Sequence, residues 1–200
     1  MFTGIISEVG RVSAIKKMKG GKELAIACSF AGNTHEDESI AVNGVCLTVV
    51  SFNGDQFHVQ CVEETLRKTS LGDLKEGSPV NLERSLTLDK GIEGHLVQGH
   101  VDTTGVITSI DQKDADLLIS VEYPQEFSDL VVGRGSIAID GISLTIARHE
   151  KNRFTVAIIP YTWEHTNLID KSEGDRVNLE FDMFGKYIIQ YLKNRESGNG

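Results

Sequence analysis

The residues most able to do chemistry in this chain stand in one short phrase that is written twice. The phrase reads NGVCLTVV where it begins at Asn43 and DGISLTIA where it begins at Asp140, so Gly, Leu and Thr recur in register. The reactive positions differ, because Asn43 becomes Asp140 and the thiol of Cys46 becomes the hydroxyl of Ser143. Thiols and hydroxyls can act as nucleophiles, and a carboxylate can act as a base. The pattern predicts two related pockets that differ in their chemistry.

Each of these side chains also has a simpler interpretation. Cys46 lies in an apolar strand-like segment, where a thiol is by default an inert core residue, and Ser143 would be a small buried hydroxyl. If both phrases pack in the same way, however, Cys46 and Ser143 occupy one structural position. Buried polar groups need hydrogen-bond partners, and a heterocyclic ligand rich in donors and acceptors could supply them.

A second polar group lies in EGHLVQGHVD, which contains His95, His100 and Asp102. In a strand, His100 and Asp102 share a face and His95 lies on the other, so a polar strand end fits the spacing better than a metal site. No metal is therefore predicted. The pattern Gly133-x-Gly135 is not a dinucleotide loop, because strand-like sequence follows where a helix would have to begin.

Composition narrows the class of protein. The net charge of −9 argues against binding to nucleic acid or to an anionic membrane. Cys28, Cys46 and Cys61 are too few and too scattered for a disulfide framework or a zinc site, which favours a reducing compartment. The N-terminus does not resemble a secretory signal, and no apolar run approaches the ~20 residues of a membrane span. We expect a cytoplasmic protein.

The duplication extends far beyond the opening phrase. ETLRKTSL recurs as YTWEHTNL, and GSPVNLE recurs as GDRVNLE, at the same distance along the chain that separates Asn43 from Asp140. TGIISEVGRVSAI and QGHVDTTGVITSI agree more loosely. Four matched blocks in one order, at the spacing of a whole small domain, predict two homologous domains joined near residues 86–93. Short segments rich in Val, Ile and Thr favour a small antiparallel barrel or sandwich, and closure into a barrel removes exposed edges. A hairpin turn is expected at FNGDQF and a helical turn at EETLRKTSLGDL.

The C-terminal segment MFGKYIIQYLKNRE has no counterpart in the first half of the chain. Its apolar side chains recur at helical spacing and form one stripe of Phe184, Tyr187, Ile188, Tyr191 and Leu192. This helix either packs back on its own domain or serves oligomerisation.

Together, MFTGII, NGVCLTV, ETLRKTSLGDL, VNLERSL, EGHLVQGHVD, IDGISLT and VNLEFD resemble the riboflavin synthase α-chain family, from Met1 to about Tyr191. The resemblance implies an all-β fold of two homologous six-stranded antiparallel Greek-key barrels plus a C-terminal α-helix. It divides the chain into an N-terminal lumazine-binding barrel (1–93), a C-terminal lumazine-binding barrel (94–183) and an oligomerisation helix with its tail (184–200). It also implies a homotrimer in which the first barrel of one chain faces the second barrel of a neighbour.

The same resemblance implies a transferase without a cofactor. Two molecules of 6,7-dimethyl-8-ribityllumazine, both bound in one active site, become riboflavin and 5-amino-6-ribitylamino-uracil by four-carbon transfer. Holding two reactants face to face gives the rate advantage of an intramolecular reaction. The alternative is a non-catalytic lumazine- or flavin-binding protein, such as the lumazine proteins of luminous bacteria, whose counterpart of GHLVQGH is degraded. The presence here of His95, His100, Cys46 and Ser143 favours the enzyme.

The reaction that the resemblance implies begins when a base removes a proton from the C7 methyl group of one lumazine. His100 is the expected proton shuttle, because an unperturbed imidazole titrates near pH ~6.5. Cys46 or Ser143 is expected to add to the acceptor ring or to position a water that does. The family also uses positions around the reaction that match Phe2, His95 and Asp140.

Substrate contacts carry over position by position. For the first barrel they are expected at Gly4, Ile5, Ile6, Cys46, Leu47, Thr48, Gln60, Cys61, Val62, Glu63, Glu64, Thr65, Gly99, His100 and Val101. For the second barrel they are expected at Ser143, Leu144, Thr145, Ala157, Ile158, Ile159, Pro160, Tyr161 and Thr162. Arg134 is a further expected contact; it stands where relatives carry Lys, and it keeps the charge but cannot readily act as a base.

Overall fold

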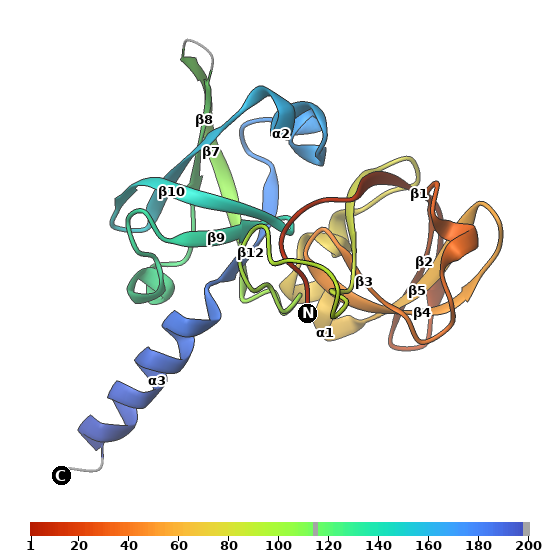
Figure 1. The fold of residues 1–200 in the computed structure, drawn as a ribbon, viewed down its shortest axis with the longest axis horizontal. Helices are drawn as coiled ribbons and strands as arrows, with labels where there is room; N and C mark the ends of the chain where they lie inside the picture. Colours follow the sequence, from red (N-terminus) through yellow and green to blue (C-terminus); the bar gives the residue numbers. More distant parts are fainter. Residues whose placement is uncertain (114–115, 198–200) are drawn as a thin grey trace.

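The computed structural model of the protein describes residues 1–113 and 116–197 and shows two β-barrels side by side (Figure 1). The first, called the N-barrel, is built from β1 (Glu8–Met18), β2 (Gly21–Ala27), β3 (Ser39–Val42), β4 (Val45–Phe52), β5 (Gln56–Val62) and β6 (Pro79–Arg84). The second, called the C-barrel, is built from β7 (Thr103–Lys113), β8 (Asp116–Glu122), β9 (Ser136–Ile139), β10 (Ile142–Glu150), β11 (Arg153–Ile158) and β12 (Arg176–Phe181).

Both barrels are closed, with all neighbouring strands antiparallel. The strand order is β1-β2-β5-β4-β3-β6 in the N-barrel and β10-β11-β8-β7-β12-β9 in the C-barrel. In each, three strands joined by hairpins are followed by a fourth that returns beside the first of them, which is a Greek key. The predicted pair of six-stranded antiparallel barrels is confirmed.

Alternation along the strands produces a separate core in each barrel. In β4, Val45, Leu47 and Val49 are buried while Thr48 and Val50 face outward, as the period of a strand requires. Each core forms one apolar cluster, and a smaller third cluster of Phe2, Ala41, Val97 and Ala138 lies apart from both. Each barrel therefore has an apolar core of its own.

Short helices follow the same strand in both barrels. The helix α1 (Glu63–Lys68) and the 3₁₀ turn η2 (Ser70–Asp73) follow β5, and α2 (Pro160–Glu164) and η4 (Asn167–Asp170) follow β11. The predicted helical turn is thus confirmed. Two further 3₁₀ turns are η1 (Ala31–Asn33) and η3 (Gln125–Leu130).

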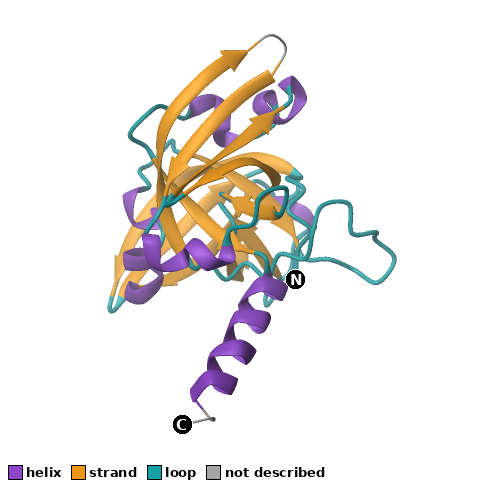
Figure 2. Ribbon diagram, turned by 90° about the vertical axis from the view of Figure 1, so that its left-hand side faces the viewer, coloured by secondary structure: helices purple, strands orange, loops and turns teal. Residues whose placement is uncertain are grey.

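The C-terminal helix α3 (Met183–Ser197) projects away from both barrels in two views (Figures 1 and 2). The five side chains of its apolar stripe are 48–65% exposed. Of the two alternatives for this helix, the structure does not show the stripe packed on its own domain, and the stripe is accessible to another molecule. None of the described helices has the length and apolar character needed to cross a membrane.

The leading segment of each half crosses to the other barrel. The first crossover segment, residues 2–6, precedes β1, and the second, residues 97–101, precedes β7; a bridge between Phe2 and Val97 joins them. The carbonyl of Gly4 accepts the backbone N–H of Ser143 in β10 at 2.8 Å, and the carbonyl of Gly99 accepts that of Cys46 in β4 at 2.8 Å. Each repeated phrase therefore meets a segment from the opposite half.

Candidate active site

The C-barrel carries a cavity of about 460 Å³ with walls from both halves of the chain. One wall is the first crossover segment with the start of β1, and the other is formed by β10 and α2. The lining residues are Gly4, Ile5, Ile6, Ser7, Glu8, Val9, Ile142, Ser143, Tyr161, Thr162, Glu164, His165 and Thr166. Its size lies in the range of small-molecule sites.

A serine and a histidine meet at this cavity. The Oγ atom of Ser143 lies 2.7 Å from Nδ1 of His95, and the backbone of His95 donates to the carbonyl of Thr3 at 3.1 Å. Burial lowers the pKa of the His95 imidazole, and the carboxylate of Asp182 opposes this shift only in part. A neutral imidazole can accept the hydroxyl proton, so the pair can activate Ser143 or a water that Ser143 holds.

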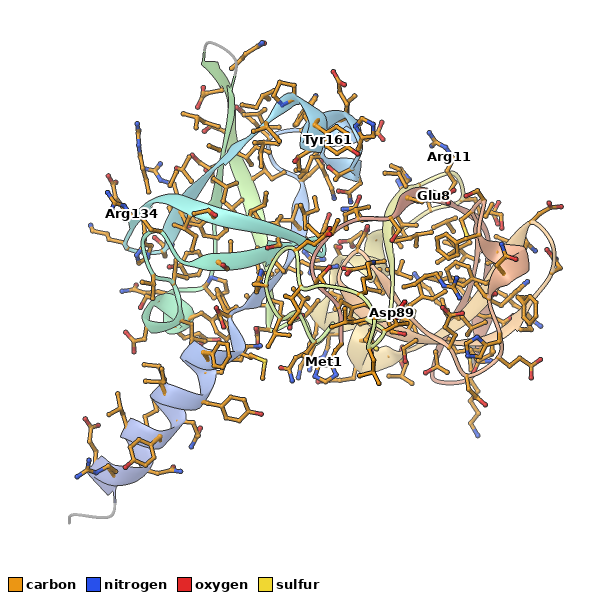
Figure 3. All side chains as sticks on the ribbon, viewed as in Figure 1. Met1, Glu8, Arg11, Asp89, Arg134 and Tyr161 are labelled. Atoms are coloured by element: carbon orange, nitrogen blue, oxygen red, sulfur yellow. The ribbon has the colours of Figure 1, made fainter. Side chains whose placement is uncertain are left out.

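An aromatic surface stands beside the cavity. The rings of Tyr161 and His165 stack with their centroids 4.0 Å apart, and Nδ1 of His165 lies 2.8 Å from the carbonyl of Tyr161. Figure 3 shows Tyr161 on the side of the C-barrel that faces the N-barrel. Such a stacked pair offers a flat apolar face to a planar ring.

Two buried glutamates hold the crossover segments in place. Glu83 of β6 accepts the backbone N–H groups of Thr3 and Gly4 at 2.7 and 2.9 Å, and Glu180 of β12 accepts those of Gly99 and His100 at 2.9 and 3.0 Å. Burial raises the pKa of both carboxyls, and the backbone donors oppose that rise. These contacts satisfy charges that would otherwise be costly to bury.

The corresponding place on the N-barrel combines Cys46, His100 and Phe2. Cys46 is half-buried beside Gly99, and a Cβ atom added to Gly99 would lie 2.6 Å from the Cβ atom of Cys46 and 2.9 Å from the ring of Phe2. His100 is exposed at the end of the second crossover segment. Among the described residues, the sulfur of Cys46 has no imidazole partner comparable to His95 at Ser143.

The structure changes the assignment of one group of predicted contacts. Gly4, Ile5 and Ile6 were expected in the N-barrel site, but they line the cavity of the C-barrel. Gly99 lies at Cys46 of the N-barrel as expected, although it belongs to the segment that leads into the C-barrel. The error arose because neighbours in sequence were assigned to one barrel, whereas these segments cross.

The other contacts predicted for the N-barrel differ in how accessible they are. Leu47 and Cys61 point into the core, and burial raises the pKa of the Cys61 thiol to about 12, so this thiol is inert. Glu64 is exposed, and its contacts with Lys68 and Arg67 hold its pKa at about 2. The other residues predicted as contacts of the N-barrel are exposed or half-buried, and their contact with substrate stays a prediction. They are Thr48, Gln60, Val62, Glu63, Thr65 and Val101.

The remaining C-barrel residues that were predicted as contacts do not line the cavity. Leu144 and Ile158 pack in the core of the barrel. Arg134 is exposed on the turn before β9, and Figure 3 shows it at the edge of the C-barrel away from Tyr161. Exposed backbone or side chains are found at Thr145, Ala157, Ile159 and Pro160. Substrate contact at these positions remains a prediction.

Asn43 and Asp140 lie at the centre of the contact between the barrels. Both have a φ of 45°, and their side-chain oxygens accept the backbone N–H of Asn81 and Asn178, respectively, at 2.7 Å. Asp140 is fully buried and also contacts Lys171 at 3.1 Å. The catalytic role expected for Asp140 stays a prediction, and these contacts favour a structural one.

Several residues that assemble the site were not predicted from the sequence. Glu83 and Glu180 end the repeated VNLE motif, and a Glu kept in both copies within an apolar strand was a usable signal. His165 and Glu164 of the cavity stand where the first half has Lys68 and Arg67, so no shared motif marked them. Within the described residues, no group of His, Cys, Asp and Glu is arranged to hold a metal ion.

Comparison with known families finds the same duplication. A family described as "Lumazine binding domain" matches residues 3–85 and again residues 98–182. Riboflavin synthase of Actinobacillus pleuropneumoniae is 45% identical over 193 residues, which cover 96% of this chain and 90% of the relative. Riboflavin synthase of Bacillus subtilis (strain 168) is 42% identical over 193 residues with the same coverage of both chains.

Solved structures share the fold at lower identity. LumP complexed with riboflavin superposes with a TM-score of 0.84 at 22% identity, and LumP complexed with 6,7-dimethyl-8-(1'-D-ribityl) lumazine with a TM-score of 0.81 at 23% identity. In both cases the match covers 90% of this chain and 99% of the other. These likenesses concern the fold, whereas the 42–45% identity to the two synthases spans nearly the whole chain.

Proposed function

This chain belongs to the riboflavin synthase family, and on that premise we propose that it converts two molecules of 6,7-dimethyl-8-ribityllumazine into riboflavin and 5-amino-6-ribitylamino-uracil. The observation that carries the proposal is the C-barrel cavity, where Ser143 and His95 lie 2.7 Å apart, while the matching place on the N-barrel carries Cys46 and His100 instead. One substrate in two chemical roles requires two pockets of similar shape and unequal reactivity.

The proposed steps balance without a cofactor. A base removes a proton from the C7 methyl group of one lumazine, and the resulting carbanion attacks the ring of the second. The four carbons that the donor loses are the four that the acceptor gains, so no oxidant or reductant is consumed. His95 and His100 are the imidazoles placed to accept and return protons during these steps.

Ser143 is the better candidate for the group that adds to the acceptor ring or holds the water that adds. Its hydroxyl has the adjacent base that activates an oxygen nucleophile, while the Cys46 thiol has no imidazole contact among the described residues. Phe2, fully buried beside Gly99 and Cys46, keeps the two crossover segments packed together.

The proposal includes a cytoplasmic homotrimer joined through α3. The exposed stripe of Phe184, Tyr187, Ile188, Tyr191 and Leu192 supports assembly, because contiguous exposed apolar surface marks interaction sites. Three free cysteines are consistent with a reducing compartment. In such a trimer, the N-barrel pocket of one chain can face the C-barrel cavity of the next.

The test is to incubate the purified protein with the lumazine alone and to follow riboflavin absorbance. We expect riboflavin and the pyrimidine product in equal amounts, with turnover lost in Ser143→Ala. A stably bound fluorophore without riboflavin would assign the chain to non-catalytic binding proteins instead.

A further inference from the structure

One lysine joins helix α3 to the segment that carries His100. The Nζ atom of Lys186 lies 2.6 Å from Oδ2 and 2.8 Å from Oδ1 of Asp102, which follows the second crossover segment directly. The side chains of Lys186 and Asp102 are only 24% and 19% exposed. Shielded from solvent in this way, the pair is held more firmly than an exposed ion pair.

Asp102 in turn fixes the end of the crossover segment against β12. Its Oδ2 atom accepts the backbone N–H of Phe181 at 2.9 Å, and its own N–H donates to the carbonyl of Leu179 at 2.9 Å. Two residues earlier, the N–H of His100 donates to Glu180 at 3.0 Å. The position of His100 therefore depends on two carboxylates, those of Asp102 and Glu180.

Lys186 is the cation that compensates these two carboxylates. Burial raises the pKa of Glu180, the positive charge of Lys186 lowers it, and the negative charge of Asp102 raises it again. Removal of Lys186 would leave the two acidic groups near each other without its positive charge. Protonation of Glu180 would then become easier, and a protonated carboxyl is a weaker acceptor for backbone N–H groups.

The first half of the chain has no such arrangement. Glu83 takes the place of Glu180 at the first crossover segment, but Ser7 stands where the second half has Asp102. The chain after β6 enters a loop, whereas the chain after β12 enters α3. The contacts among Lys186, Asp102 and Glu180, here called the clamp, are thus specific to the segment that lies on the N-barrel.

We propose that Lys186 is a positioning residue for the N-barrel site at Cys46 and His100, which it holds in shape through Asp102 while tying that site to helix α3. The inference rests on the proposed function, since it concerns the same site. Lys186 acts through the 99–102 backbone, so its loss displaces His100 and the contact between Gly99 and Cys46. If α3 also joins the subunits, assembly and pocket geometry are linked by this side chain.

The test compares variants of the full chain. Lys186→Met should lower kcat by roughly tenfold to a hundredfold, because displacing a reacting group by about 1 Å has effects of this size. Its pH–rate profile should lose activity at a higher pH on the acid side than the wild type, since the charges acting on Glu180 are those of Lys186 in α3 and Asp102, and Glu180 holds the backbone N–H of His100. Lys186→Arg should restore most of the rate and the original profile.

Two controls separate positioning from a general loss of charge or fold. Lys90→Met removes an exposed lysine near Glu83 and should change kcat less than twofold. Asp102→Asn and the double variant with Lys186→Met should be about equally impaired, because the two residues act through one contact. If Lys186→Met fails to fold, Lys186→Arg and Asp102→Asn carry the comparison.

Unchanged kcat and pH profile in Lys186→Met would overturn the inference, as would additive losses in the double variant. Lumazine titration by fluorescence makes the test independent of turnover: Lys186→Met should weaken one class of site at least fivefold and leave the other unchanged. Equal affinities in both proteins would also overturn it. Absence of riboflavin formation by the wild type would instead contradict the proposed function, and the titration would still decide the role of Lys186.

Discussion

Replacing Gly4 by Ala tests whether the N-terminal segment completes the C-barrel cavity. Gly4 has a φ of 77°, and a Cβ atom built there would lie 2.5 Å from the Cβ atom and 2.8 Å from the backbone nitrogen of Ser143. These atoms belong to β10 and cannot move aside as a flexible side chain would. The methyl group should therefore push the crossover segment away from Ser143.

The expected magnitude has two parts. A non-glycine residue in the left-handed region costs about 1–2 kcal/mol, and forcing a methyl group into a packed site costs about 1–3 kcal/mol. The free energy of unfolding should therefore fall by about 2–5 kcal/mol in Gly4→Ala. Gly77 is the matched control, because its φ is 87° but no atom lies within 4 Å of an added Cβ. Gly77→Ala should show the conformational cost of about 1–2 kcal/mol alone.

Urea unfolding of both variants measures the two contributions to the free energy of unfolding, and steady-state kinetics measures the effect on turnover. Gly4→Ala should lose more than tenfold in riboflavin formation, because the displaced segment holds the backbone N–H groups of both Ser143 and His95. Gly77→Ala should retain turnover within about twofold at temperatures where it is folded. If Gly4→Ala unfolds like Gly77→Ala and turns over at the wild-type rate, residues 2–6 do not shape the cavity and the crossover argument fails.

His95→Gln should reduce the loss of stability that the wild type shows in acid. Because burial lowers the folded-state pKa of His95, the free energy of unfolding of the wild type falls as the pH drops from about 6.5 through that lowered pKa. The difference in melting temperature between pH 5 and pH 7.5 should therefore be smaller in the variant than in the wild type. A chain that ends after Lys186 keeps the clamp but lacks most of the α3 stripe, so sedimentation should show weaker assembly with both barrels folded. Each stripe side chain that assembly buries contributes roughly 1.5–3 kcal/mol. A stable trimer of the shortened chain would contradict this role of the stripe. A fragment of residues 1–102 should bind lumazine more tightly in a fluorescence titration than a fragment of residues 1–93, because only the longer one contains Gly99 and His100.

The fold could be predicted because its determinants are local and are written twice. Alternation in β4, with Val45, Leu47 and Val49 inward, is visible in the sequence, and the repeat fixes the number of barrels. The helix α1 was also visible as a break in that alternation. Such signals depend on neighbouring residues, so one sequence is enough to show them.

The assembly of the site could not be predicted, because its contacts join residues far apart in the chain. Nothing near Gly4 indicates that its carbonyl meets Ser143. His95 and His100 share one motif, yet His95 contacts Ser143 of the C-barrel. His100 follows Gly99, which packs against Cys46 of the N-barrel. Spacing within a motif says which residues are near in sequence, and here the crossover of the segments separates them in space.

The change from Asn43 to Asp140 has its own physical account. Both residues adopt the same left-handed backbone and accept the N–H of an asparagine in the last strand of their barrel, so either side chain satisfies the turn. A fully buried carboxylate also needs a compensating charge, and Lys171 supplies it at 3.1 Å, where the first half has Leu74. Asn43 with Leu74 in the first half and Asp140 with Lys171 in the second therefore both leave this contact without an uncompensated charge.

The change from Cys46 to Ser143 is not accompanied by a matching change in the contact between the barrels. What accompanies it is His95, whose imidazole lies 2.7 Å from Ser143 and whose pKa burial lowers. Since a hydroxyl needs an adjacent base to become a nucleophile while a thiol needs much less help, the two substitutions fit different chemistry at one structural position. We therefore expect the functional difference between the pockets to depend on Ser143 and His95, and the difference at Asp140 to preserve the contact between the barrels.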